Sequence, residues 1–192
     1  MATMSTIQRM TYEEYLASPE TVQRYDIIDG EMIMSPAPTS DHQWISFRIA
    51  RALQDHVEPH KLGVVLYAPV DVLIRRDPLR VRQPDVLFLS AARTGITGRE
   101  GLRQMPIITV PPDLVVEILS PTETRLDIEE KLADYRSIGV LESWLVSPET
   151  QTVEVLRLSS EKMETVAVFG MGQSVRSEVL PELTLTVAEV FA

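Results

Sequence analysis

Short apolar runs, separated by Gly, Pro or charged residues, recur through the middle of the chain. Near the amino end, residues 25–28 and 31–34 flank Asp29-Gly30, a pair that tight hairpin turns favour. Further along, four branched, apolar runs have the length and composition of sheet strands with a covered face. These runs span residues 62–66, 70–74, 86–89 and 114–119. The pattern therefore predicts a hairpin followed by the strands of a core sheet.

Helical signals interrupt this strand pattern. Thr11, with Glu14 three residues later, has the form of a capping box and predicts a short helix over residues 12–17. A longer helix is expected over residues 123–137, because Gly139 follows it in the usual C-terminal position. Both segments are therefore assigned to helices.

A third helix is expected between Pro38 and Pro59. Thr39 or Ser40 can cap its start, and its apolar residues recur at helical spacing. We expect these residues to form one face that packs on the sheet. They are Trp44, Phe47, Ile49, Ala50, Leu53 and Val57.

The second half of the chain adds strands and one irregular segment. Gly and Pro residues break the pattern between residues 90 and 112, which predicts a long loop holding one irregular turn. The tail, residues 183–191, is expected to add a strand or a short helix. Further strands are expected at residues 142–146, 153–158 and 165–169. The order of elements favours a mixed α/β fold, with a mixed sheet flanked by helices, over a regular doubly wound fold.

Length and composition fit one domain. The chain has 192 residues, of which 44% are hydrophobic and 24% charged, close to the average for globular proteins. We therefore expect a single domain over residues 1–192, with residues 1–10 as a flexible N-terminus. No apolar run approaches the roughly 20 residues of a membrane span, and residues 1–10 lack the apolar segment of a secretory signal. A cytoplasmic location without membrane contact is therefore expected.

Two carboxylates stand beside or inside apolar runs. Asp85 opens one apolar strand, and Glu117 lies within another, 32 residues later. A carboxylate in such a run is costly to desolvate unless a partner compensates its charge. If the two strands are neighbours, both carboxylates can bind one hard cation. Because the chain has no cysteine, any metal must be held by oxygen or histidine, and oxygen ligands favour Mg²⁺ or Mn²⁺.

Lys131 extends this arrangement. It follows Asp127 by one helical turn, where its charge could orient an attacking water or stabilise the transition state of phosphoryl transfer. Each residue also has an ordinary structural explanation. An acid at a strand end usually meets solvent, and Lys131 taken alone is a helix-surface residue paired with Asp127. The combination of two acids and a lysine is what favours a catalytic metal site.

The distribution of charge bears on nucleic-acid binding. A net charge of −10 argues against a protein that coats nucleic acid. Between Arg75 and Arg103, however, seven arginines accompany three acids, so this window carries +4 and the remainder −14. Solvated loops around a strand explain such a window. A local phosphate-binding patch is the alternative, and the presence of Asp85 inside the window favours it.

Several motifs occur together in one order, from about Tyr12 to Phe191. They are Tyr25 to Glu31, Ser35-Pro36 followed by His42, Ala68 to Val72, Gln83 to Val86, Pro112 to Pro121, Asp127 with Lys131 and Tyr135, and Gly139 to Val146. In this order they resemble the Uma-type restriction endonucleases, a bacterial family of the PD-(D/E)xK nuclease superfamily. The chain departs from this family at Asp26, where glutamate is usual.

The resemblance implies a restriction-endonuclease-like fold and Mg²⁺-dependent hydrolysis of phosphodiester bonds. Asp85 takes the PD position and Glu117 that of the second acid, both as metal ligands. Leu119 stands where the superfamily pattern has lysine, so the resemblance assigns that charge to Lys131 on the following helix. His42 is explained equally well as a residue at a helix start. Auxiliary roles near the metal are implied for Glu31, His42 and Gln83.

Two functions of different classes follow. The first is a metal-dependent endodeoxyribonuclease in which Asp85 and Glu117 bind the metal and Lys131 positions the attacking water. Its DNA backbone contacts would be Arg75, Arg76, Arg80 and Arg82. The second is a nuclease fold kept as a DNA-binding or regulatory module with little or no catalysis, which the net charge of −10 favours. Hydrolysis of another phosphate on the same fold stays open. A homodimer is expected, because cutting both strands of a duplex usually needs two sites related by a two-fold axis.

Overall fold

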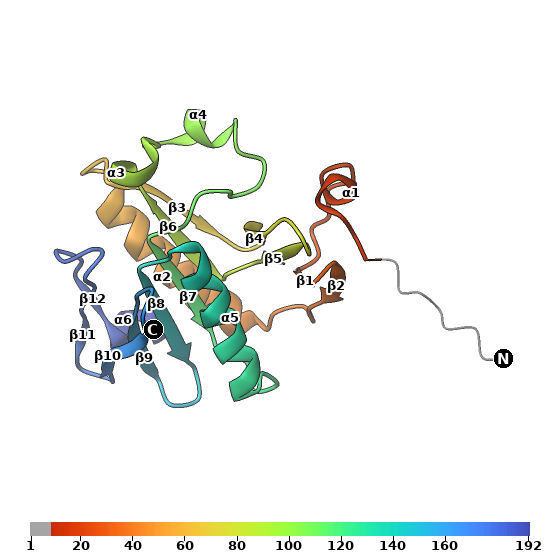
Figure 1. The fold of residues 1–192 in the computed structure, drawn as a ribbon. Helices are drawn as coiled ribbons and strands as arrows, with labels where there is room; N and C mark the ends of the chain where they lie inside the picture. Colours follow the sequence, from red (N-terminus) through yellow and green to blue (C-terminus); the bar gives the residue numbers. More distant parts are fainter. Residues whose placement is uncertain (1–8) are drawn as a thin grey trace.

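Six strands form the central sheet, in the order β10-β9-β8-β7-β6-β3 (Figure 1). The computed structural model describes residues 9–192. β7 and β8 run parallel and the other neighbours antiparallel, so the sheet is mixed, as the sequence predicted. The strands are β3 (Gly63–Tyr67), β6 (Val86–Ser90), β7 (Leu114–Ile118), β8 (Glu142–Ser147), β9 (Thr152–Leu158) and β10 (Met163–Phe169).

One long helix covers each face of this sheet (Figure 1). α2 (Ser40–Val57) buries Ile49 against the face that carries Val116. α5 (Arg125–Ile138) packs on the opposite face, which carries Val115. Alternate residues of β7 therefore point toward different helices, as expected for a buried strand with both faces covered. This explains why its sequence, apart from Glu117, is apolar rather than alternating.

A smaller, four-stranded sheet has the order β2-β1-β5-β4. Its strands are β1 (Tyr25–Ile28), β2 (Glu31–Met34), β4 (Val72–Arg75) and β5 (Arg80–Arg82), and α1 (Tyr12–Leu16) lies near it in Figure 1. β1 and β2 pair across the predicted Asp29-Gly30 turn. The sequence did not predict β5, because Arg80 and Arg82 gave it the character of a solvated loop. Both arginines are in fact buried.

The remaining elements are short. The expected loop between residues 90 and 112 contains α3 (Ala91–Thr94) and α4 (Arg99–Leu102), and Ile108 forms an isolated bridge to Val72. The tail contains both elements that were considered for it, a short strand and a short helix. These C-terminal elements are β11 (Ser174–Val175), β12 (Leu185–Thr186) and α6 (Val187–Phe191).

The predicted helix boundaries are confirmed by their caps. At α1, the Thr11 and Glu14 side chains each accept a hydrogen bond from the other residue's backbone amide. At α5, Thr124 and Asp127 form a second capping box, and Gly139 ends the helix with a left-handed φ of 88°. Asp127 is therefore engaged at the start of α5 by Thr124.

Two expectations need correction. The strand expected at residues 70–74 is β4 of the smaller sheet and not a strand of the central sheet. Trp44 and Phe47 do not face the sheet: each is about half exposed, and their rings lie against one another on the outside of α2. The inward stripe instead contains Ile45, together with the other four predicted residues, so the predicted face is wrong only in the first two turns of the helix. A flexible N-terminus was expected over residues 1–10. Of these, residues 1–8 lie outside the part of the chain that the structure describes. At Met10 the chain is held, because its amide donates to the Gly30 carbonyl, 2.8 Å away.

Gly63 opens β3 at a point where the backbone leaves no room for a side chain. Its φ is +152°, and an added Cβ would lie 2.0 Å from the Leu89 carbonyl oxygen on β6. We expect Gly63→Ala to lower the free energy of unfolding by about 2–4 kcal/mol, since strain and steric overlap act together. Gly98→Ala is the control, because nothing lies within 4 Å of its added Cβ. Urea unfolding of both variants measures the difference, and equal stabilities would contradict this description of the β3–β6 edge.

Candidate active site

Asp85 and Glu117 lie next to each other on neighbouring strands. Val86 pairs with Val116 in the antiparallel β6–β7 register, which places the preceding Asp85 opposite Glu117. The Asp85 amide donates to the Val116 carbonyl, with an N–O distance of 3.1 Å. Both side chains are buried, Asp85 at 2% and Glu117 at 4% exposure. The fold therefore brings two carboxylates together at the N-terminal end of β6. Because both are buried, the negative charge of each needs a compensating partner.

Asp85 is compensated by three groups from different parts of the chain. Its Oδ1 lies 2.7 Å from Nη1 of Arg24, and its Oδ2 accepts a hydrogen bond from the Ile118 amide at 2.7 Å. His42, near the start of α2, places its Nε2 3.3 Å from the same Oδ2. Burial alone would raise the pKa of Asp85, but the contact with His42 and the charge of Arg24 outweigh it and lower the pKa. Asp85 is thus held ionised.

Glu117 contacts two side chains of α5. Oε2 accepts a hydrogen bond from Nζ of Lys131 at 2.9 Å, and Oε1 accepts one from the Tyr135 hydroxyl. Burial raises the pKa of Glu117 against the opposing charge of Lys131, and the neighbouring Asp85 adds to the increase. Burial also raises the pKa of Tyr135, with a further contribution from Glu117, which keeps this hydroxyl a donor.

Lys131 is bound between two acids. In addition to Glu117, its ammonium donates to Glu123 at 2.6 Å, and its side chain is only 19% exposed. Burial would lower the pKa of Lys131, but the charges of Glu117 and Glu123 outweigh it and raise the pKa, so the lysine stays protonated. The ordinary explanation of Lys131 as a surface residue paired with Asp127 is therefore wrong. The lysine points inward, and Asp127 caps α5 instead.

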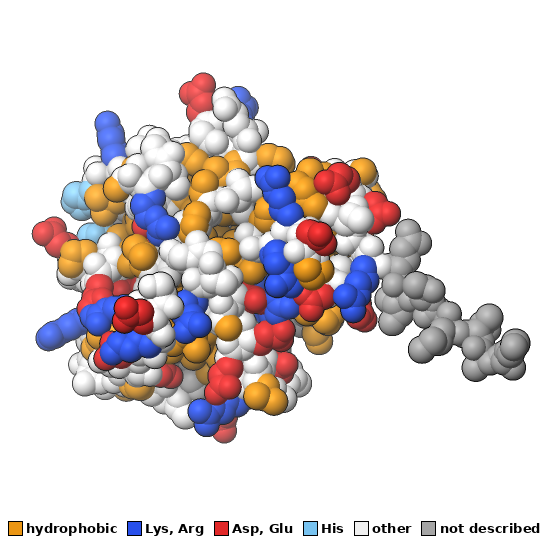
Figure 2. Space-filling model, viewed as in Figure 1, with side chains coloured by type: hydrophobic (Ala, Val, Ile, Leu, Met, Phe, Trp, Pro, Cys, Tyr) orange, Lys and Arg blue, Asp and Glu red, His pale blue; other side chains and the backbone are white. Residues whose placement is uncertain are grey.

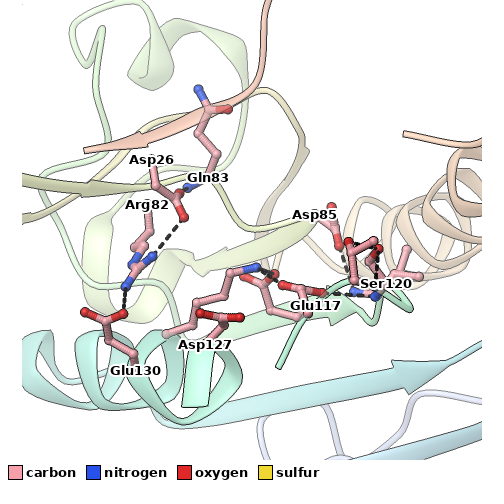
Figure 3. A network of polar contacts seen from close by, with 12 residues as sticks. Asp26, Arg82, Gln83, Asp85, Glu117, Ser120, Asp127 and Glu130 are labelled. Carbon is pink, nitrogen blue, oxygen red and sulfur yellow. Dashed lines mark hydrogen bonds and ion pairs between the residues drawn. The ribbon is translucent and has the colours of Figure 1, made fainter. Parts of the chain in front are cut away.

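A second set of polar contacts involves Gln83, two residues before Asp85; Figure 3 shows Gln83 beside Asp26. The Gln83 side chain accepts from the Tyr25 amide at 3.1 Å and donates to Asp71 at 2.7 Å. Asp71 also accepts a hydrogen bond from the Tyr25 hydroxyl at 2.7 Å. Gln83 therefore fixes the backbone that carries Asp85, and its polar atoms are engaged away from the two carboxylates.

Similarity to known proteins extends over nearly the whole chain. The family model Uma2, described as "Putative restriction endonuclease", matches residues 12–188. The chain belongs to this family. A crystal structure of a "putative nuclease belonging to DUF820" from Anabaena variabilis is similar, with a TM-score of 0.77 and 24% sequence identity over 95% of this chain and 97% of that one. At this identity the likeness shows a shared fold. No match was found among curated proteins.

Membership of the Uma2 family supports a nuclease and agrees with the resemblance drawn from the motifs. The shared fold agrees with the mixed sheet and flanking helices predicted for the chain. In the part of the chain that the structure describes, no helix has both the length and the apolar character needed to cross a membrane.

Two of the predicted phosphate-binding arginines have internal partners. Arg82 lies 2.8 Å from Asp26 and 2.6 Å from Asp134, and Arg80 pairs with Asp134 at 2.7 Å and with Glu130. These contacts join β1 and β5 to α5 (Figure 3). Neither arginine is presented to a DNA backbone in this arrangement, because both side chains are buried. Their physical role is to compensate acids between the small sheet and α5.

Arg75 and Arg76 remain at the surface. Arg75 lies 2.5 Å from Asp29, and the Arg76 guanidinium stacks over the Tyr12 ring at 4.8 Å from its centroid. In the space-filling view of Figure 2, Lys and Arg side chains are interspersed with acidic ones rather than forming one continuous basic surface. Of the four arginines predicted to contact the DNA backbone, two are therefore exposed, and Arg75 lies beside a carboxylate.

Glu31 is not brought to the acid pair. It is exposed and pairs with Ile28 next to the hairpin turn, at the opposite end of β1 from Arg24. Sequence reasoning missed Arg24 and Glu123, which contact Asp85 and Lys131. Arg24 directly precedes the predicted β1, and Glu123 stands before α5, so neither lies in a pattern that indicates burial. Their roles depend on the packing of distant segments.

Proposed function

We propose that this member of the Uma2 family is a metal-dependent endonuclease that hydrolyses phosphodiester bonds of DNA. One observation carries the proposal: two buried carboxylates, Asp85 and Glu117, lie side by side, and a lysine that is only 19% exposed is bound to one of them. Burying charged side chains is costly. Ionisable groups that shift each other's pKa values are typical of catalytic sites. The catalytic set is therefore Asp85, Glu117 and Lys131.

The donor set fits a hard divalent cation. Oδ1 of Asp85 is buried and accepts no hydrogen bond, so it retains lone pairs for a ligand. Within residues 9–192 no group of three or more His, Asp and Glu side chains is arranged to hold a metal. The protein would thus supply Asp85 and Glu117, leaving other positions to water and phosphate oxygens, as Mg²⁺ and Mn²⁺ sites commonly do. Such an ion, when bound, polarises the phosphate and lowers the pKa of water.

Two side chains of α5 hold Glu117 in position for its proposed role as a metal ligand. The Tyr135 hydroxyl binds one carboxylate oxygen and the Lys131 ammonium the other, so both oxygens have fixed positions. In the reaction, Lys131 orients the attacking water and offsets negative charge that develops at the phosphate. Glu123 holds the ammonium from its other side, which keeps it charged and in place.

DNA is the proposed substrate, with Arg75 and Arg76 as the exposed arginines of the predicted contact. The net charge of −10 predicts that binding is weak and strongly dependent on salt unless a cation is present. A two-fold dimer would place two such sites on the two strands of a duplex.

Cleavage of supercoiled plasmid tests this function. We expect nicked or linear product with Mg²⁺ or Mn²⁺, none with EDTA, and a loss of activity of about 10² or more in Glu117→Gln. Arg125→Gln is the control, because this exposed side chain on α5 contacts Glu129 only. Salt-sensitive DNA binding that persists in EDTA, with no cleavage of single- or double-stranded DNA by any metal, would instead favour the binding-module hypothesis.

A further inference from the structure

The Arg24 guanidinium contacts the oxygen of Asp85 that a metal would use. Oδ2 is engaged by the Ile118 amide and faces His42, whereas Oδ1 accepts no hydrogen bond. The Arg24 guanidinium lies 2.7 Å from that Oδ1. Because this contact is an ion pair without hydrogen-bond geometry, it compensates the charge of Asp85 without satisfying the oxygen. The same oxygen cannot serve a cationic guanidinium and a divalent cation at once.

Two of the three guanidinium nitrogens of Arg24 have a partner there. Its Nη2 donates to the Gln83 carbonyl at 3.0 Å, while its Nε is buried and has no partner. Arg82, by comparison, is held by two carboxylates, those of Asp134 and Asp26, whereas the Arg24 guanidinium forms an ion pair with Asp85. Arg24 therefore acts at this site mainly as a positive charge.

Arg24 also has a path away from the site. It precedes β1 in a segment whose residues 18–23 are exposed, and its own side chain is 18% exposed. Turning this side chain outward breaks the contacts with Asp85 and Gln83 but removes no apolar side chain from the core. Burial alone would lower the pKa of Arg24, yet the charges of Asp85 and then Glu117 raise it, so both acids contribute to holding the cation.

We propose that Arg24 is a further functional residue of the site: its guanidinium occupies the cation position at Asp85, and a divalent metal binds only by displacing it. This inference rests on the proposed function, because it assumes that Asp85 and Glu117 are metal ligands. Arg24 then sets the metal affinity of the free protein. Without metal it keeps two adjacent buried carboxylates from repelling each other.

The test is Mn²⁺ binding by calorimetry to the native protein, Arg24→Gln, Arg24→Gln/Asp85→Asn and the control Arg125→Gln. We expect Arg24→Gln to bind at least about tenfold more tightly than the native protein, because one competing charge is removed. Arg125→Gln removes the same charge from an exposed site and should match the native protein. The double variant should not bind.

The outcomes separate two failures. If Arg24→Gln and the native protein bind equally and the double variant does not bind, the role of Arg24 is wrong and the metal site stands. If no variant binds, the metal site itself fails. If Arg24→Gln is destabilised, thermal unfolding with and without Mn²⁺ tests the proposal instead. Mn²⁺ should then raise the unfolding midpoint of Arg24→Gln more than that of the native protein, or restore the folding of the variant. A variant that Mn²⁺ does not stabilise would overturn the proposal.

Discussion

Replacing Lys131 with alanine is expected to abolish DNA cleavage while changing Mn²⁺ affinity by less than about tenfold. The lysine contacts Glu117 without belonging to the proposed ligand set, so its removal leaves both carboxylates in place. Loss of a positioned charge that acts in the transition state typically costs about 10²–10³ in rate. Plasmid cleavage at saturating metal measures the rate, and calorimetry measures the affinity.

The control for this variant is Arg125→Ala, which removes an exposed cation of the same helix. It should retain native activity. If Lys131→Ala cleaves DNA at the native rate, the lysine has no place in the mechanism. If instead it loses metal binding together with cleavage, its role is to hold Glu117 rather than to act on the phosphate.

Arg82→Met is expected to lower the free energy of unfolding by about 3–5 kcal/mol. The side chain is buried between Asp26 and Asp134, at 2.8 and 2.6 Å, and its removal leaves Asp26 without its arginine and Asp134 with Arg80 alone. Breaking one partner of a buried ion pair typically has an effect of this size, even where the intact pair adds little. Urea unfolding, monitored by circular dichroism, measures the change.

The matched control is Arg125→Met, since Arg125 forms an exposed i,i+4 pair with Glu129 on the same helix. That change should alter stability by about 0.5 kcal/mol or less. Adding Asp26→Asn to Arg82→Met should recover part of the loss, because the charge left without its arginine is then removed. Equal stabilities of Arg82→Met and Arg125→Met would show that the contacts of Arg82 do not join the small sheet to α5.

Much of the fold is local in origin and could be predicted. The Asp29-Gly30 hairpin, the capping box at Thr11 and the terminal Gly139 are short-range signals, and each appears in the structure where expected. The central strands were recognisable because burial on both faces demands continuous apolar runs. These features need no knowledge of what packs against them.

The elements that were missed depend on distant partners. Arg80 and Arg82 make β5 look like a solvated loop, and only the acids of β1 and α5 allow those side chains to be buried. Trp44 and Phe47 were assigned to the inward face of α2 because both are apolar, and hydrophobic spacing alone does not show which apolar residues the sheet covers. Both lie outside.

The candidate site could also be predicted only in part. Asp85 and Glu117 stood out because each is an acid in an apolar setting, and the structure places them side by side. The partners of these acids were not evident. Arg24 comes from the segment before β1 and Glu123 from the segment before α5, so their contacts arise only from the tertiary fold.

Mn²⁺ binding to the native protein, Asp85→Asn and Glu117→Gln tests the central claim most directly, because it requires no knowledge of the DNA substrate. The account predicts that the native protein binds, at an affinity that Arg24 limits, and that each substitution abolishes binding. Arg125→Gln should bind as the native protein does. Binding that is indifferent to both acid substitutions would contradict the assignment of Asp85 and Glu117 as metal ligands, and with it the proposed mechanism.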